Sequence, residues 1–409
     1  MKKIVVSFLV LVMVASISLV GISCKNTTAA ETTAAAETTA AAETTAAAET
    51  TKETEGQKKD GFVIGFANGY FGNTWRSQFI DGAVAVADKW KQKGIIKEFI
   101  VQNVNDDITK QITQLNALID QGVDCLVINP VSADSLAPIV KRCAEEGILI
   151  VNCDDPAAYE GTYSVCGDHR AFVGIMAKWL VDKLKDETEA KIVLIQGLAG
   201  NSCDNVRRDE IHKIIDPNKN IKQLGEAPGG WNETLAQEAM QQFLSSFPEI
   251  DAVFTQDVQA NGVMRAYDIA GKPYPLMTGD TINGFFKAWE AYLTKDPNWE
   301  TIGVTYNPGI GGDAVEVAVR LLMGKKFNDG VLKPNQVKPE LINTLVVPPA
   351  FVVTKEAISG DEEWLKGYEL KPFTQFISLS EALKQLEGKE DGVQLDATVS
   401  DEALDSLMK

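Results

Sequence analysis

The feature that most constrains this chain is the alternation of short apolar runs with stretches of helical spacing after residue 61. Ten strand-like runs follow one another, from "FVIGFA" at Phe62–Ala67 to "TIGVTY" at Thr301–Tyr306. In one segment between them, "DDITKQITQLNALIDQG", the apolar residues fall on one helix face and Gly122 ends the pattern. Continuous apolar strands separated by amphipathic helices predict an α/β fold with parallel sheets covered on both faces.

Ten strands are too many for one doubly wound sheet, so we predict two sheets. The break between them is expected near Cys166–Asp168, before a long helical stretch. Further on, "LINTLVVPPAFVVTKEAI" (Leu341–Ile358) reads as two strands separated by Pro348 and Pro349. A Pro-Pro pair cannot lie inside a central strand, which favours a crossing between lobes there. An aromatic segment and an acidic helical tail end the chain.

The N-terminus has the pattern of an export signal, predicted over residues 1–23. Two lysines precede a charge-free apolar run from Ile4 to Val20, and small residues follow. Cys24 stands where bacterial lipoproteins carry their acylated cysteine, and "LVGISC" resembles a lipobox with Gly21 where leucine is usual. The alternatives are an ordinary signal peptide cut nearby and an uncleaved anchor.

Residues 24–60 are predicted to be a disordered tether between the membrane and the folded part. The segment repeats "ETTAAA" and contains no large apolar side chain, so it cannot bury enough surface to offset the entropy of ordering. The formal net charge of the chain is −18. Such an acidic surface disfavours nucleic acid and anionic lipid as partners.

Metal, cofactor and nucleophile motifs are not expected in this chain. Five cysteines follow Cys24, none in a CxxC pair, and only two histidines are present. These counts argue against structural zinc, and we expect buried thiols, with a Cys153–Cys166 bridge as the alternative. The sequence has no GxSxG elbow, and "QGLAGNS" (Gln196–Ser202) matches neither phosphate-binding glycine motif.

Polar and aromatic residues gather just past the carboxyl ends of seven predicted strands, where open α/β sheets bind ligands. Each of them has an alternative explanation, as a helix cap for Asp and Asn or as core for Trp. Together, carboxylates, amides, a guanidinium and flat indole faces suit the hydroxylated rim and apolar faces of a sugar ring. The residues are Asn73, Trp75, Arg76, Asn129, Asp154, Asp155, Asn205, Trp231, Asp257 and Asp280.

Several of these segments resemble the type 1 periplasmic sugar-binding proteins, the ribose-binding-protein group of ABC importers. They are "FGNTWRSQFIDGA", "LVINPVSADSL", "ILIVNCDDPA", "IQGLAGNSCDNVRRDEI", "FPEIDAVFTQD" and "MTGDTINGF", in the family's order and spacing between Phe62 and Thr354. The resemblance implies two Rossmann-like lobes joined by three crossings, near Gly167, Tyr306 and Pro348. It assigns 61–166 plus 307–348 to the first lobe and 167–306 plus 349–409 to the second.

The resemblance also implies ligand contacts from all ten strand-end residues and from Tyr306. At four positions the chain differs from ribose binders, which implies another sugar or a polyol. Arg76 replaces a second aromatic residue and Asp257 replaces an asparagine, while Asp155 and Asn205 stand where ribose binders have arginine.

We therefore expect a monomeric, lipid-anchored solute-binding protein outside the cytoplasm that closes on a sugar or polyol and passes it to an ABC transporter permease. It needs no cofactor and no catalysis. A sugar or quorum-signal chemoreceptor is the alternative within the same class. A glycoside-acting enzyme using paired carboxylates such as Asp154 and Asp257 is the alternative from another class.

Overall fold

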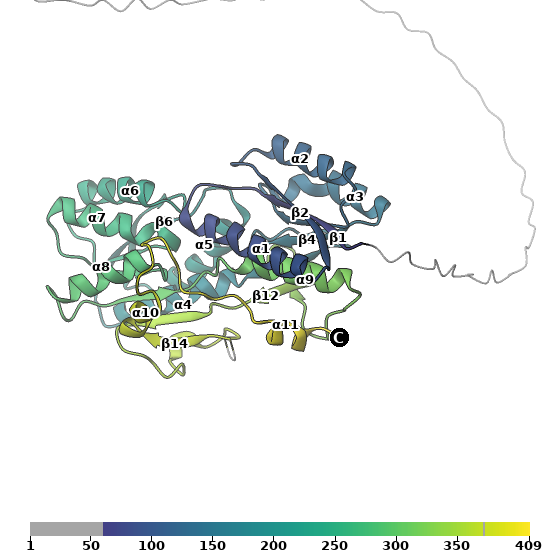
Figure 1. Ribbon diagram of the computed structural model, residues 1–409. Coiled ribbons are helices and arrows are strands. Elements are labelled where there is room, and N and C mark those ends of the chain that lie inside the picture. The colour runs from purple at the N-terminus through teal and green to yellow at the C-terminus, as the bar shows by residue number, and fades with distance from the viewer. Residues whose placement is uncertain (1–59, 371–372) are drawn as a thin grey trace, which may run out of the picture. The chain divides into compact units, whose positions relative to one another are not determined.

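A computed structural model describes residues 60–370 and 373–409 (Figure 1). The predicted signal peptide, Cys24 and all of the tether except its last residue lie outside the described residues. The described chain forms two seven-stranded sheets with helices on both faces. The predicted α/β architecture with two sheets is therefore confirmed.

The first sheet, with its helices, is called the first lobe. Its strands are parallel except for the β11–β12 pair. Helices α1 (Thr74–Gln92) and α9 (Ile310–Leu322) pack together on one face, and α2 (Ile108–Asp120) and α3 (Ala137–Glu146) cover the other. The strand order is β11 (Lys333–Pro334), β12 (Ile342–Val347), β5 (Tyr163–Gly167), β4 (Leu149–Cys153), β3 (Cys125–Asn129), β1 (Phe62–Asn68) and β2 (Ile96–Asn103).

The second sheet, with its helices, is called the second lobe, and only its β10–β13 pair is antiparallel. Its strand order is β14 (Gln375–Ser378), β13 (Phe351–Thr354), β10 (Thr301–Val304), β9 (Leu276–Gly279), β8 (Ala252–Phe254), β6 (Ala190–Gln196) and β7 (Ile221–Pro228). Its helices are α4 (His169–Leu184), α5 (Ser202–Ile215), α6 (Glu233–Ser246), α7 (Ala260–Ala270), α8 (Asn283–Leu293) and α10 (Leu379–Gln385).

The chain passes between the two sheets at three places. It leaves the first sheet after Gly167, returns between Val304 and Ile310, and leaves it again between Val347 and Phe351. The Pro348–Pro349 pair lies in this last connection, where no ladder hydrogen bond is required of it. The residue boundaries given above for the two lobes stay a prediction.

The last fifty residues join both sheets. β14 pairs with β13 at the edge of the second sheet, a strand that the sequence pattern did not indicate. Helix α11 (Asp401–Leu407) instead contacts the first lobe, where Met408 bridges to Phe327. The final ten residues thus contact the first lobe, and the lobe boundary given for residues 349–409 stays a prediction. Charged pairs fix them to α1 and α9.

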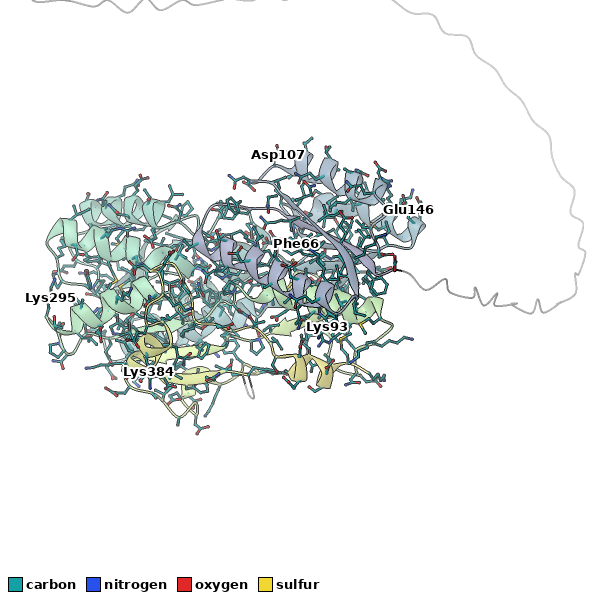
Figure 2. All side chains as sticks on the ribbon, viewed as in Figure 1. Phe66, Lys93, Asp107, Glu146, Lys295 and Lys384 are labelled. Carbon is teal, nitrogen blue, oxygen red and sulfur yellow. The ribbon has the colours of Figure 1, made fainter. Side chains whose placement is uncertain are left out.

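The interior is mainly apolar, and most charged side chains lie at the surface. Phe66 is fully buried, whereas Lys93, Asp107, Glu146, Lys295 and Lys384 lie exposed at the periphery (Figure 2). In α2, Leu115 and Ile119 are buried as the helical spacing predicts, but Ile108 at the first turn is 44% exposed. Burying the apolar side chains of both lobes is the main driving force for this arrangement.

Helices α6 and α7 approach each other closely at Gly262, and this makes a testable prediction. A Cβ at Gly262 would collide with the Glu233 carbonyl oxygen, a backbone atom that cannot move aside. Gly262→Ala is therefore expected to lower the free energy of unfolding by about 1–3 kcal/mol. Urea unfolding followed by circular dichroism measures it.

Gly82→Ala is the matched control for Gly262→Ala, because Gly82 is also inside a helix but has no heavy atom nearer than 3.9 Å to the added Cβ. Alanine should there stabilise α1 by about 0.5–1 kcal/mol. Equal effects at both positions would show that close packing of α6 on α7 is not what requires glycine.

Candidate functional site

A small cavity lies between the two lobes at the carboxyl ends of their strands. Its volume is about 30 Å³, which is room for a water molecule or two. Residues from the first lobe, the second lobe and the connection after β10 all line it. They are Tyr70, Asn73, Trp75, Arg76, Asp154, Asp155, Cys203, Arg207, Trp231, Asp257 and Tyr306.

On the first-lobe side of the cavity, Arg76 faces the carboxylates that follow β4. Arg76 Nη2 lies 2.9 Å from Asp154 Oδ2, and both side chains are buried. Burial opposes the charge on Arg76, but Asp154 and Asp155 raise its pKa above the ordinary value. Burial and the neighbouring Asp154 raise the pKa of Asp155. This wall therefore offers one fixed cation against two carboxyl groups.

On the second-lobe side, Arg207 forms the equivalent pair. Arg207 Nη1 donates to Asp257 Oδ2 at 2.5 Å and to Gln256 Oε1 at 2.9 Å. The guanidinium carbon lies 4.2 Å from the centre of the Tyr306 ring. Burial raises the pKa of Asp257, although the Arg207 charge lowers it. Each lobe thus presents one buried arginine–carboxylate pair to the cavity.

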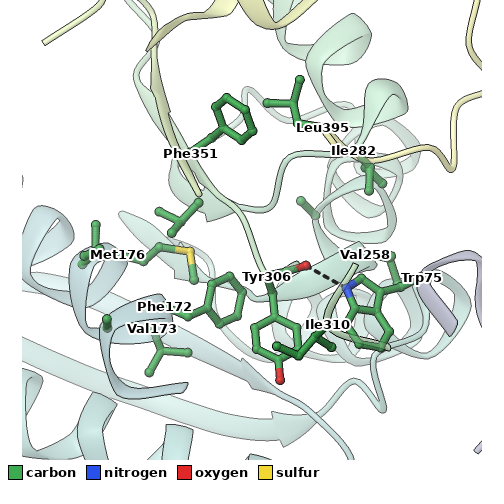
Figure 3. Close-up of a cluster of buried hydrophobic side chains, with 14 of the residues drawn as sticks. Trp75, Phe172, Val173, Met176, Val258, Ile282, Tyr306, Ile310, Phe351 and Leu395 are labelled. Carbon is green, nitrogen blue, oxygen red and sulfur yellow. Dashed lines mark hydrogen bonds between the residues drawn. The ribbon is translucent and has the colours of Figure 1, made fainter. Parts of the chain in front are cut away.

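An aromatic cluster joins the lobes beside these charges (Figure 3). Trp75 Nε1 donates to the Tyr306 carbonyl oxygen at 2.7 Å, and the two rings stack with centroids 5.3 Å apart. Phe172 of α4 contacts the Tyr306 ring from another side. Trp75 is therefore both core and cavity wall, so the two interpretations offered for it do not exclude each other.

His169 lies behind the cavity and contacts Cys203, which lines it. Arg207 Nε donates to His169 Nδ1, so Nε2 carries the imidazole proton and donates to the Asp154 carbonyl oxygen at 3.2 Å. Burial, together with Arg207, lowers the pKa of His169 well below its ordinary value. The Cys203 thiol donates to Asp155 Oδ1, and burial raises its pKa well above the ordinary value. His169 is thus neutral and Cys203 is an unreactive thiol.

Backbone strain is concentrated in the cavity wall. Of the four described non-glycine residues with positive φ, three line the cavity: Asp154 (63°), Trp231 (50°) and Asp257 (53°). Each such residue costs of order 1–3 kcal/mol and persists only where its surroundings hold it. Strained backbone conformations are concentrated at ligand sites. Here they place the carboxylates of Asp154 and Asp257 and the indole of Trp231 in the wall of one cavity.

Eight of the eleven predicted contact residues line the cavity: Asn73, Trp75, Arg76, Asp154, Asp155, Trp231, Asp257 and Tyr306. Asn73 also caps α1 through its Oδ1, while its Nδ2 donates to the Trp231 carbonyl oxygen across the lobes. Asn129 lies just behind the wall, where its Nδ2 donates to Asp155 Oδ2 at 2.9 Å. It positions the carboxylates without lining the cavity.

Two predicted residues lie elsewhere. Asn205 is exposed on α5, because it falls on the helix face opposite the cavity, and Arg207 takes the place expected for it. Asp280 is fully buried but away from the cavity, and Gln394 Nε2 donates to its Oδ2 at 3.3 Å. Burial raises the pKa of Asp280 well above its ordinary value. Neither Asn205 nor Asp280 therefore lines the cavity in this structure, and a ligand contact from either of them stays a prediction.

Sequence reasoning missed Tyr70, Cys203 and Arg207. A signal for two of them is present, because Cys203 and Arg207 are four residues apart and so share one face of α5. If Cys203 faces the crevice at the start of α5, then Arg207, one helical turn later, faces the crevice as well. Tyr70 lies in the turn after β1, where the pattern gives no orientation.

Residues 64–326 match the family described as periplasmic binding protein domain. The chain belongs to this family. Periplasmic binding proteins are non-enzymatic solute-binding components of transporters that work outside the cytoplasm, so the chain is not an enzyme. The resemblance drawn from the motifs is confirmed, and the glycoside-acting alternative is not supported.

Individual periplasmic binding proteins are similar over most of their own length. A xylitol-binding protein of Mycolicibacterium smegmatis is 28% identical over 271 residues, 58% of this chain and 76% of that protein. A ribose import binding protein of Bacillus subtilis is 26% identical over 282 residues, 68% and 87% of the two chains. A solute binding protein from Thermobispora bispora shares the fold, with a TM-score of 0.62 at 22% identity over 82% of this chain and 99% of that one.

Two further observations concern the described residues alone. None of the helices within residues 60–370 and 373–409 is long and apolar enough to cross a membrane. In the same part of the chain, no three His, Cys, Asp or Glu side chains are grouped so as to hold a metal ion.

Proposed function

We propose that this periplasmic binding protein captures a small, uncharged sugar or polyol in the cavity between its lobes and delivers it to an ABC importer. The observation that carries the proposal is the set of polar atoms left over in the cavity wall. Among the described residues, Arg76 Nε and Nη1 and Asp257 Oδ1 are buried without a hydrogen-bond partner. A buried polar atom without a partner costs about 1–3 kcal/mol, and solute hydroxyls supply both donors and acceptors to such atoms.

The charge in the wall argues for a neutral solute. Three carboxyl groups, from Asp154, Asp155 and Asp257, face two guanidinium groups, from Arg76 and Arg207. A phosphate or carboxylate ligand would add negative charge to a buried site that has no surplus cation. Hydroxyl groups instead bridge between members of the existing ion pairs.

Solute entry requires the lobes to separate. A cavity of about 30 Å³ is far below the about 300–1,000 Å³ of ligand pockets. Three connections, near Gly167, Tyr306 and Pro348, join the two sheets of the described chain. A hinge at these connections opens the cavity, and a solute that contacts both walls favours closure by its differential affinity.

A thermal-shift screen tests the proposal. The panel contains ribose, allose, xylitol and myo-inositol, with ribose 5-phosphate and gluconate as charged controls. A neutral polyol at about 100 times its dissociation constant should stabilise the folded state by about 2.7 kcal/mol and raise the melting temperature. Calorimetric titration then gives the affinity. Stabilisation by the charged compounds alone would contradict the proposal.

The membrane attachment is a separate part of the proposal. It is supported by the sequence pattern alone: a signal peptide over 1–23, acylation of Cys24 and a tether over 24–60 holding a monomer at the membrane. Growth with an alkyne-tagged fatty acid should label the wild-type protein and not Cys24→Ser. Equal labelling of both would place the anchor elsewhere.

A further inference from the structure

The chain after α10 does not end on the second lobe but runs along both lobes. Residues 391–409 are called the C-terminal strap. On the second lobe, Asn283 N donates to the Val393 carbonyl oxygen at 2.9 Å and Gly284 N donates to that of Asp391 at 2.8 Å. Ile282 forms a β-bridge with Gln394. The strap is therefore paired with the backbone at the start of α8.

The same strap residues are bonded to the first lobe through Gln78 of α1. Gln78 Nε2 donates to the Gly392 carbonyl oxygen at 2.9 Å, and its Oε1 accepts from Gln394 N at 3.0 Å. Since Gln394 Nε2 donates to Asp280, this one residue is hydrogen-bonded to both lobes at once. Gly392 lies so close to Thr74 that a Cβ would stand 2.7 Å from its methyl carbon.

The end of the strap is fastened to the first lobe by charge. Asp401 lies 2.8 Å from Lys89 Nζ and 3.3 Å from Arg320 Nη2, while Asp405 lies 3.0 Å from Arg320 Nε and 2.9 Å from Lys325 Nζ. Arg320 is itself buried against Glu316. The hydrogen bond that the Asp401 carboxylate accepts from Lys89 lowers its pKa. The strap thus has one attachment in the second lobe and a second, ionic one in the first.

We infer that the C-terminal strap holds the two lobes together and so sets how readily the cavity opens. The bonds of Gln394 to Gln78 and to Asp280 coexist only while the lobes keep their present spacing. Any opening that separates α1 from β9 breaks at least one of them or peels the strap from α1. The hydrogen bonds and ion pairs of the strap therefore stabilise the closed arrangement of the lobes relative to an open one. Its effect on solute affinity rests on the proposed function, whereas its effect on lobe spacing does not.

Spin-label distance measurements on the full-length protein test the inference without any solute. Labels are placed by Lys110→Cys on α2 and Glu238→Cys on α6, both exposed and in different lobes. The five described native thiols are buried and stay unlabelled, and Cys24 is replaced by serine in every variant. One test variant is Asp401→Asn with Asp405→Asn, which leaves the Arg320–Glu316 pair intact. The other is Gly392→Ala, which wedges the strap away from Thr74.

Both test variants should increase the population with the longer interlobe distance. The two aspartates form four partly exposed ion pairs, and the loss of these pairs corresponds to a change of roughly 2- to 10-fold in the opening equilibrium. Asp120→Asn and Glu300→Gln are the controls, because they remove exposed ion pairs inside a single lobe and should leave the distances unchanged.

Unchanged distances in both strap variants, with native circular dichroism, would overturn the inference. If all variants show the same interlobe distances and bind polyol normally, the proposed function stands and only the inference about the strap is rejected. If instead the distances lengthen but no polyol binds to any variant or to the wild type, the strap holds and the proposed function fails.

Discussion

Replacing Arg207 with leucine is expected to lower the free energy of unfolding by about 3–5 kcal/mol, the usual cost of removing one member of a buried ion pair. The Arg207 side chain is 1% exposed, and its loss leaves Asp257 charged and without its cation. It also removes the donors to His169 Nδ1 and Gln256 Oε1. Denaturant unfolding with constant m-values measures the change.

The double variant Arg207→Met with Asp257→Asn is the matched control. It removes both charges, so no isolated ion is left buried, and asparagine tolerates the positive φ that Asp257 adopts. The double variant should be clearly more stable than Arg207→Leu. If it is as unstable as the single variant, packing of the guanidinium on Tyr306 and Phe172, and not its charge, is what matters.

The Arg207→Leu deficit should also depend on pH with a definite sign. In the native protein burial already raises the pKa of Asp257 and Arg207 lowers it, so removing Arg207 raises this pKa further. The folded variant then binds a proton that the unfolded chain releases near its ordinary carboxyl pKa of about 3.9. Stability therefore falls as the pH rises from that value through the raised pKa. A deficit that is larger at pH 4 than at pH 7 would refute this account.

Trp231→Ala is expected to weaken polyol binding by about 1–3 kcal/mol, or roughly 5- to 160-fold, because aromatic residues carry much of the binding energy in such sites. The indole packs on Gly197 and lies 5.4 Å from the Arg207 guanidinium, so it forms one wall of the cavity. Calorimetric titration with whichever polyol the screen identifies measures the effect. Trp364→Ala, in the second lobe but away from the cavity, is the control.

Trp231→Gly separates the binding role of this residue from its backbone role. Glycine adopts the φ of 50° found at Trp231 without the penalty that alanine or tryptophan carries. The glycine variant should therefore be more stable than the alanine variant while binding polyol equally poorly. Severe unfolding of both variants with unchanged affinity would show that Trp231 is a core residue only.

The central strands of both lobes were predictable because they are buried on both faces. Continuous apolar runs such as those of β3 and β6 are typical of buried strands. All ten predicted runs are strands in the structure. The edge strands β11 and β14 were not predicted, since β11 has two residues and contains Pro334, and β14 has four residues of which only Ile377 is buried. Short edge strands carry little of the apolar signal on which the prediction depends.

Sequence predicts the site residues that lie directly after strands, but not those whose position depends on the rotation of a helix or on distant contacts. Asp154 and Asp257 lie at turns directly after strands, so their position in the crevice follows from topology. Asn205 was preferred over Arg207 because sequence alone does not fix how α5 is rotated, and residues two apart face opposite sides. The burial of Asp280 depends on Gln394, which is 114 residues distant along the chain. Nothing local to either residue indicates that contact.

The five described cysteines have a practical consequence for how the protein is made. Cys125, Cys143, Cys153, Cys166 and Cys203 are all buried free thiols, so the alternative of a Cys153–Cys166 bridge is wrong here. The folded domain therefore keeps one covalent form in reducing and in oxidising surroundings. Its production requires no oxidising folding catalyst, and reducing agents should leave its melting temperature unchanged.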